Sequence, residues 1–80
     1  MKTVTLLSKT DCHLCEIAKE VLLRVQKSTP FEFQERKIVP GEADFEKYKE
    51  HVPVILFDGK LEFQHRVSER ELRERLKEKE

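Results

Sequence analysis

The stretch TVTLLSKTDCHLC, residues 3–15, contains the features that decide the fold. Residues 3–7 are mostly apolar, which predicts a short β-strand that is buried on both faces. The stretch ends in the only two cysteines of the chain, Cys12 and Cys15, which form a Cys-x-x-Cys. A helical recurrence of apolar residues predicts a helix over residues 12–27. We therefore expect the cysteine pair where a strand has ended and a helix begins.

A cysteine pair at the start of a helix is typical of thiol–disulfide exchange. The unpaired N–H groups of a first helical turn favour a thiolate, and such sites can lower a cysteine pKa to roughly 3.5–7.5. Cys12 is the expected attacking thiol, and Cys15, one turn further on, is the expected resolving thiol. A bridge between them closes so short a loop that a purely structural staple is a poor interpretation.

The rest of the chain predicts an α/β fold in a single domain, residues 1–80. The helix over 12–27 would bury one apolar face, made of Leu14, Ile17, Ala18, Val21, Leu22 and Val25. The elements predicted after it are a strand over 31–37, a helix over 42–50, strands over 54–57 and 60–65, and a helix that begins at Ser68. Asp58-Gly59 is a hairpin signal, and Ser68 with Glu71 matches a capping box. The order β-α-β-α-β-β-α is that of a minimal thioredoxin fold, a four-stranded mixed sheet flanked by three helices.

Composition argues against several classes of partner. The 16 basic and 16 acidic residues cancel, which gives no bulk attraction to nucleic acid or anionic membranes. No apolar run approaches the roughly 20 residues of a membrane span, and the N-terminus lacks the pattern of a signal peptide. We expect a cytoplasmic protein, a monomer, in a compartment where thiols are kept reduced and disulfides tend to be transient and catalytic.

Two segments resemble the glutaredoxin-like branch of the thioredoxin superfamily. They read SKTDCHLC at residues 8–15 and VPVI at residues 52–55, and the resemblance extends over essentially the whole chain. It implies a dithiol–disulfide oxidoreductase that reduces protein or low-molecular-weight disulfides through a mixed disulfide. Such an enzyme would act in electron transport and cell redox homeostasis.

The resemblance also implies a substrate site around the cysteines. Lys9 matches a glutaredoxin lysine that contacts the glutathione carboxylate. Pro53 matches a proline that is cis and packs beside the cysteines, and Val52 would offer its backbone N–H and C=O to a substrate. His13 lies between the cysteines, and in its protonated form it would favour the Cys12 thiolate. Lys9 and His13 could equally be ordinary exposed side chains.

Two departures from the glutaredoxin pattern leave the reductant open. Typical members carry Cys-Pro-Tyr-Cys, whereas His13 and Leu14 stand between the cysteines here, and the glycine-rich turn before the last helix is replaced by residues 64–69, which contain no glycine. We expect no bound cofactor. Glutathione stays a possible reductant beside a protein dithiol or a thioredoxin-reductase-type donor.

Two alternatives use the same residues differently. The cysteines could be half of a tetrahedral zinc site completed by His13, His51 or His65, or part of a metal-carrying module, although no histidine has the spacing of a paired ligand motif. The chain could also be a redox-silent interaction module that has kept the fold.

Overall fold

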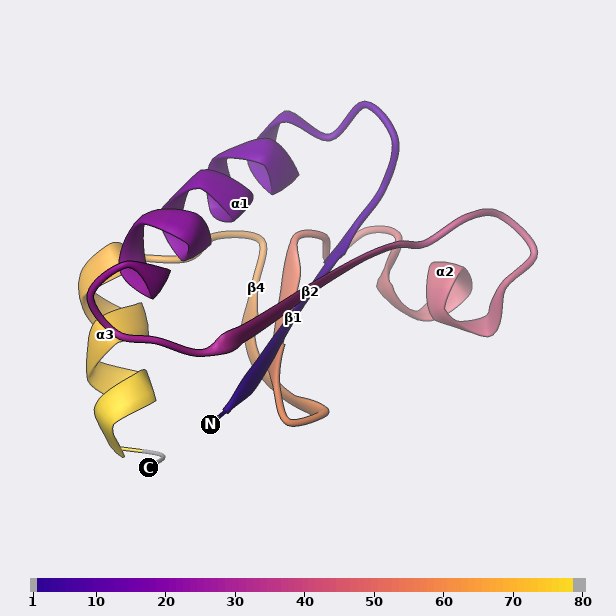
Figure 1. The fold of residues 1–80 in the computed structure, drawn as a ribbon. Helices are drawn as coiled ribbons and strands as arrows, with labels where there is room; N and C mark the ends of the chain where they lie inside the picture. Colours follow the sequence, from indigo (N-terminus) through magenta and orange to yellow (C-terminus); the bar gives the residue numbers. More distant parts are fainter. Residues whose placement is uncertain (1, 79–80) are drawn as a thin grey trace.

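The structure is a computed structural model, and it describes residues 2–78. Its elements are β1 (Thr3–Ser8), α1 (His13–Gln26), β2 (Glu32–Lys37), α2 (Ala43–Tyr48), β3 (Val54–Phe57), β4 (Lys60–Gln64) and α3 (Glu69–Glu78). The predicted order of elements is confirmed, and the predicted bounds differ by one or two residues at several ends (Figure 1).

The four strands form one mixed sheet in the order β2-β1-β3-β4. β1 runs parallel to β2, as expected for two strands that a helix connects, and antiparallel to β3, which in turn pairs antiparallel with β4. In this register Leu6 of β1 lies between Glu35 of β2 and Ile55 of β3. The central strands β1 and β3 are therefore the apolar ones, and the charged strand β2 lies at an edge.

Two apolar clusters hold the helices to the sheet. The larger cluster lies between the sheet, α1 and α3, which occupy the same side of the strands (Figure 1), and includes Leu6, Leu22, Ile55, Leu72 and Leu76. The smaller cluster lies at the end of the sheet where α1 begins, and its buried members are Leu7, Cys15, Ile38, Val52 and Val54. Phe45 and Tyr48 of α2, which lies on the other side of the strands, pack against this second cluster.

The apolar face predicted for the first helix is only partly buried. Ala18, Val21, Leu22 and Val25 are in the core, but Leu14 and Ile17 are 44% and 42% exposed. Both lie in the first turns of α1, where the loop after β4 lines a groove beside them instead of covering them. No other part of the described residues covers these two side chains. The prediction that they belong to the core is therefore wrong.

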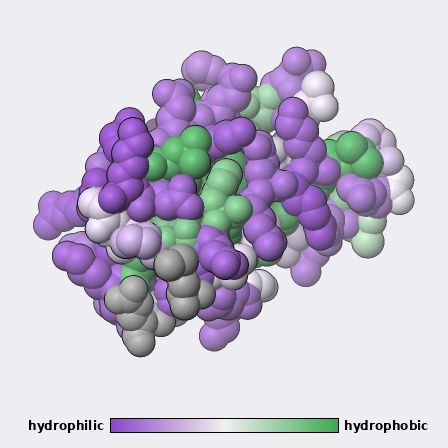
Figure 2. Space-filling view, in the orientation of Figure 1, coloured by the Kyte–Doolittle hydropathy of each residue, from purple (hydrophilic) through white to green (hydrophobic). Residues whose placement is uncertain are grey.

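The start of α3 is fixed in the predicted way. The N–H of Glu71 donates to the Ser68 hydroxyl oxygen at 3.3 Å, so Ser68 caps the helix. Glu69 then accepts from Arg24 of α1 at 2.8 Å and from Arg73 at 2.9 Å, and these two hydrogen bonds lower the pKa of its carboxyl. The Arg24–Glu69 pair joins α3 to α1 at the surface. Figure 2 shows that the surface is largely hydrophilic in this view. Within residues 2–78, no helix has the length and apolar character that crossing a membrane requires.

Candidate active site

Cys12 is the N-cap residue of α1. Its backbone is extended (φ −112°, ψ 99°), and its sulfur accepts a hydrogen bond from the N–H of Cys15 at 3.2 Å. The turn that delivers it passes through Asp11, whose left-handed φ of 58° an aspartate tolerates better than most residues do. A sulfur in this position occupies the place of a capping oxygen, where the partial positive charge of the helix end stabilises an anion.

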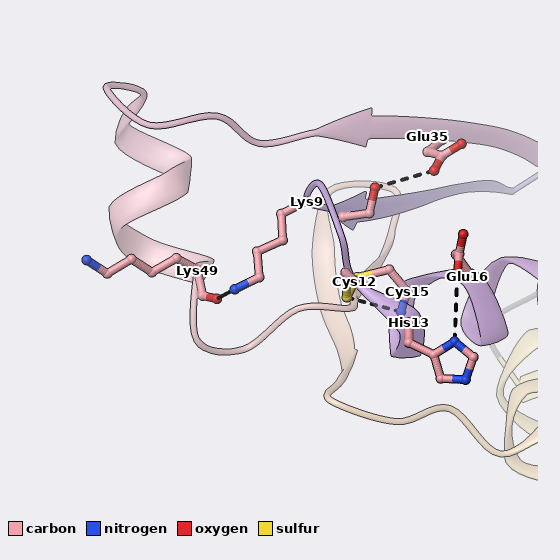
Figure 3. The surroundings of a disulfide bond; sticks show 8 residues. Lys9, Cys12, His13, Cys15, Glu16, Glu35 and Lys49 are labelled. Carbon is pink, nitrogen blue, oxygen red and sulfur yellow. Dashed lines mark hydrogen bonds and ion pairs between the residues drawn. A yellow bond between two sulfur atoms is a disulfide. The ribbon is translucent and has the colours of Figure 1, made fainter.

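Cys15 lies one turn along the same helix and is bonded to Cys12 in a disulfide, with the two Cα atoms 5.2 Å apart (Figure 3). Its side chain is buried in the smaller cluster, whereas Cys12 is only partly buried and packs against that cluster from outside. The two sulfurs thus differ in access. The attacking role of Cys12 and the resolving role of Cys15 stay predictions.

The Val52–Pro53 peptide bond is cis, which the resemblance to glutaredoxins implies. Val52 shares the smaller cluster with Cys15, and Pro53 is fully buried at the entry to β3. The structure therefore places both residues at the same end of the sheet as the disulfide. The N–H of Val52 donates to the carbonyl of Tyr48 at 3.1 Å, so a substrate would compete with that bond. The docking role of Val52 and Pro53 stays a prediction.

Lys9 extends away from the disulfide in Figure 3. Its ammonium donates to the backbone carbonyl of Lys49 at 3.1 Å, at the C-terminal end of α2. A cation at this end of a helix satisfies a carbonyl that has no partner within the helix. Lys9 therefore joins the loop before α1 to α2, and contact with a glutathione carboxylate stays a prediction that would require this side chain to move.

His13 projects into solvent from the first turn of α1. Its side chain is 83% exposed, and its Nδ1 lies 3.8 Å from the carboxylate of Glu16 (Figure 3). The influence of His13 on the cysteines stays a prediction.

A charged cleft beside the disulfide contains two charged residues, Lys19 and Glu35, for which the sequence predicted no role in the site. Its lining includes both cysteines together with Ser8, Lys19 and Glu35. The buried Ser8 hydroxyl donates to Glu35 at 3.3 Å, and the Lys19 ammonium lies 2.9 Å from the same carboxylate. The hydrogen bond from Lys19 is the main cause of a lowered Glu35 pKa, and partial burial opposes it. The parallel pairing of β1 with β2 places Ser8 near Glu35, and α1 brings Lys19 to the same carboxylate, so no local pattern in the sequence marks these residues.

A second, more apolar groove lies along the first turns of α1. It is lined by Leu14, Ile17, Ala18, His65, Arg66 and Val67. Leu14, Ile17 and Ala18 come from the helix that carries the cysteines, and the other three residues come from the loop between β4 and α3. The signal in the sequence was the apolar periodicity itself, which extends one turn further than the core that the fold supplies.

The residues of the four-ligand zinc site considered as an alternative do not come together within residues 2–78. No group of three or more histidine, cysteine or acidic side chains in that range is arranged to hold a metal ion. His13 faces Glu16, whereas His51 and His65 face each other at the junction of α2, β3 and β4. The three histidines are thus divided between two places.

Solved structures show the class of fold to which these features belong. The chain is similar to thioredoxin-2 of the malaria parasite, with a TM-score of 0.65 over 98% of this chain and 82% of that one, at 18% sequence identity. The fold is therefore the thioredoxin fold, in the minimal form predicted from the order of the elements. A cysteine pair opening the first helix and a cis proline entering the third strand occur here within that fold.

A narrower assignment comes from the sequence. The family described as "Glutaredoxin-like domain (DUF836)" matches residues 3–77, and the chain belongs to that family. Among solved structures, protein XcR50 from X. campestris is similar at 28% identity and a TM-score of 0.79, covering 94% of this chain and 96% of that one. Protein Ne2328 from Nitrosomonas europaea is similar at 25% identity and a TM-score of 0.74, covering 84% and 81%. The glutaredoxin-like resemblance is confirmed, and the disulfide-bonded pair supports a redox-type function.

Proposed function

We propose that the protein is a dithiol–disulfide oxidoreductase that reduces protein or low-molecular-weight disulfides. One observation carries the proposal: Cys12 caps the first helix, where it accepts the N–H of Cys15, while Cys15 lies buried within bonding reach behind it. A partly exposed sulfur stabilised as an anion, with a protected second sulfur one turn away, is what a two-step exchange requires.

The proposed reaction begins from the reduced protein. The Cys12 thiolate attacks one sulfur of the substrate disulfide, the substrate S–S bond breaks, and the released substrate thiolate takes a proton from solvent. The Cys15 thiolate then attacks the Cys12 sulfur of the mixed disulfide and releases the second substrate thiol. The substrate has gained two electrons, and the protein is left with the Cys12–Cys15 disulfide seen in this structure.

The oxidised protein must then receive two electrons from a donor thiol. Two molecules of glutathione, a protein dithiol or a thioredoxin-reductase-type enzyme would each balance the reaction, and a reducing compartment such as the cytoplasm supplies all three kinds. The engaged Lys9 ammonium and the absence of glycine before α3 favour a protein donor, because both features remove contacts expected for glutathione.

The test is turnover of insulin disulfides and of hydroxyethyl disulfide with each donor in parallel. We expect Cys12→Ser to abolish dithiol turnover, and Cys15→Ser to accumulate a mixed disulfide that mass spectrometry detects. Each cysteine variant serves as the control for the other, because both remove one of only two sulfurs that can form the bridge. Full turnover by Cys15→Ser would refute the assigned roles, and no turnover with any donor would instead indicate a redox-silent interaction module.

A further inference from the structure

His51 and His65 form a pair outside the cysteine site. The Nδ1 atom of His51 lies 3.5 Å from the Nε2 atom of His65, and the two ring planes meet at 72° with the ring centroids 5.4 Å apart. Both side chains are exposed to solvent. The two residues are 14 positions apart in the sequence, so their meeting is a product of the fold.

The backbone holds the two residues together independently of their side chains. The N–H of His65 donates to the carbonyls of His51 and Pro53, each at 3.0 Å, and the N–H of His51 donates to the carbonyl of Tyr48 at 2.8 Å. The loop that follows α2 is thereby tied to the end of β4. Two imidazoles on such a tied frame lose little freedom when a ligand joins them, which favours binding.

We propose that His51 and His65 form a binding site for a divalent transition-metal ion of the zinc class, completed by water molecules. Two nitrogens bound to one tetrahedral zinc at 2.0–2.1 Å lie about 3.4 Å apart, which is close to the spacing between these two atoms. The proton that one ring now gives to the other moves to the opposite ring nitrogen, so both facing nitrogens offer a lone pair to the metal. Imidazole nitrogen is a preferred ligand for zinc, copper and nickel ions.

The site lies near the cysteine pair, because His51 directly precedes Val52, which shares the smaller cluster with Cys15. It does not depend on the cysteines, which are bonded to each other in this structure. The proposal can therefore be tested on the oxidised protein, where neither sulfur is available as a thiolate ligand. The metal-site proposal would therefore survive a failure of the redox proposal, and the redox proposal would survive a failure of the metal-site proposal.

The experiment is titration of the oxidised, tag-free protein with Zn²⁺, followed by calorimetry and by the imidazole NMR signals. We expect one saturable site, weakened at least about tenfold by His51→Gln or His65→Asn, since even loss of a supporting group costs 10–100-fold. Asparagine suits position 65 because it tolerates the left-handed φ of 70° found there. His13→Gln is the matched control, and it should change the affinity by less than about twofold, since its ring faces Glu16 instead.

A second measurement reports the ligands directly. With Cu²⁺ as the probe, electron paramagnetic resonance should show coupling to two ring nitrogens in the wild type and to one in His51→Gln. The proposal is overturned if Zn²⁺ shows no saturable binding at millimolar concentration, if His51→Gln binds as tightly as the wild type, or if His13→Gln loses as much affinity as His51→Gln. Should His65→Asn fail to fold, the comparison of His51→Gln with His13→Gln still decides.

Discussion

Reduction of the Cys12–Cys15 bridge should change the free energy of unfolding only slightly. The two cysteines are three positions apart, so the bridge closes a loop of four residues. Loop-closure entropy for that length stabilises the folded state by about 2 kcal/mol at 25 °C. In the reduced protein a thiolate on Cys12 would regain about 0.3–1 kcal/mol from the helix terminus. We therefore expect the oxidised form to be more stable by about 1–2 kcal/mol.

The size of the stability difference between the oxidised and reduced forms distinguishes a redox-active disulfide from a structural disulfide. An 80-residue domain has a stability of about 4–12 kcal/mol, so the fold survives loss of the bridge in every turnover. The assay is urea unfolding at pH 7 with and without a phosphine reductant, with equal m-values confirming that the same surface is exposed. The double variant Cys12→Ala/Cys15→Ala is the control and should not respond to the reductant.

Two results would refute this reasoning. A reduced form more stable than the oxidised form would mean that the thiolate gains more from the helix than the loop entropy supplies. A gap above about 4 kcal/mol would show that the bridge acts as a structural staple, because only much longer loops give such values by entropy alone. Either outcome would change the interpretation of the site, since turnover requires both forms to be folded.

Three further predictions concern the surroundings of the site and the core. The hydrogen bond from Lys19 lowers the pKa of Glu35 in the folded protein, so the ionised carboxylate stabilises the fold above about pH 4.5. This stabilisation is lost as the pH falls through the folded-state pKa. Acid unfolding of Glu35→Gln should therefore show a smaller drop in the free energy of unfolding than the wild type, by under about 1 kcal/mol. Lys9→Met removes the bond to the carbonyl of Lys49, the C-cap residue of α2, and should lower the free energy of unfolding in urea by about 1 kcal/mol. An unchanged free energy of unfolding would show that this bond does not stabilise the fold. Leu72→Ala, at a fully buried position of α3, should cost about 2–5 kcal/mol in the same assay, whereas Leu61→Ala, 48% exposed, should stay within about 0.5 kcal/mol; equal costs would contradict the assigned core.

Local patterns in the sequence were enough to predict the order of the elements. Apolar periodicity marks α1, a continuous apolar run marks β3, the Asp58-Gly59 turn joins β3 to β4, and Ser68 caps α3. Each of these signals involves residues that are close together in the sequence, so it can be recognised without knowledge of the tertiary structure. The position of the cysteines at the start of α1 follows from the same local evidence.

The rest of the site depends on contacts between distant segments. Leu14 continues the apolar face of α1, but whether it is buried depends on where the loop before α3 runs. The meeting of Glu35 with Ser8 requires the parallel register of two strands, and the meeting of His51 with His65 requires the end of β4 to reach the loop after α2. Apolar periodicity predicts which face of a helix or strand is apolar, but it does not predict which other segment of the chain packs against that face.

The edge strand β2 bears on how the protein associates with others. Four of its six residues, Glu32, Glu35, Arg36 and Lys37, are charged, and most of the strand is exposed. A second chain that added a strand there would have to strip water from these ions, which opposes sheet extension into dimers or fibrils. The charges of β2 therefore disfavour strand addition at this edge, and two of them, Glu35 and Lys37, also line the cleft beside the disulfide.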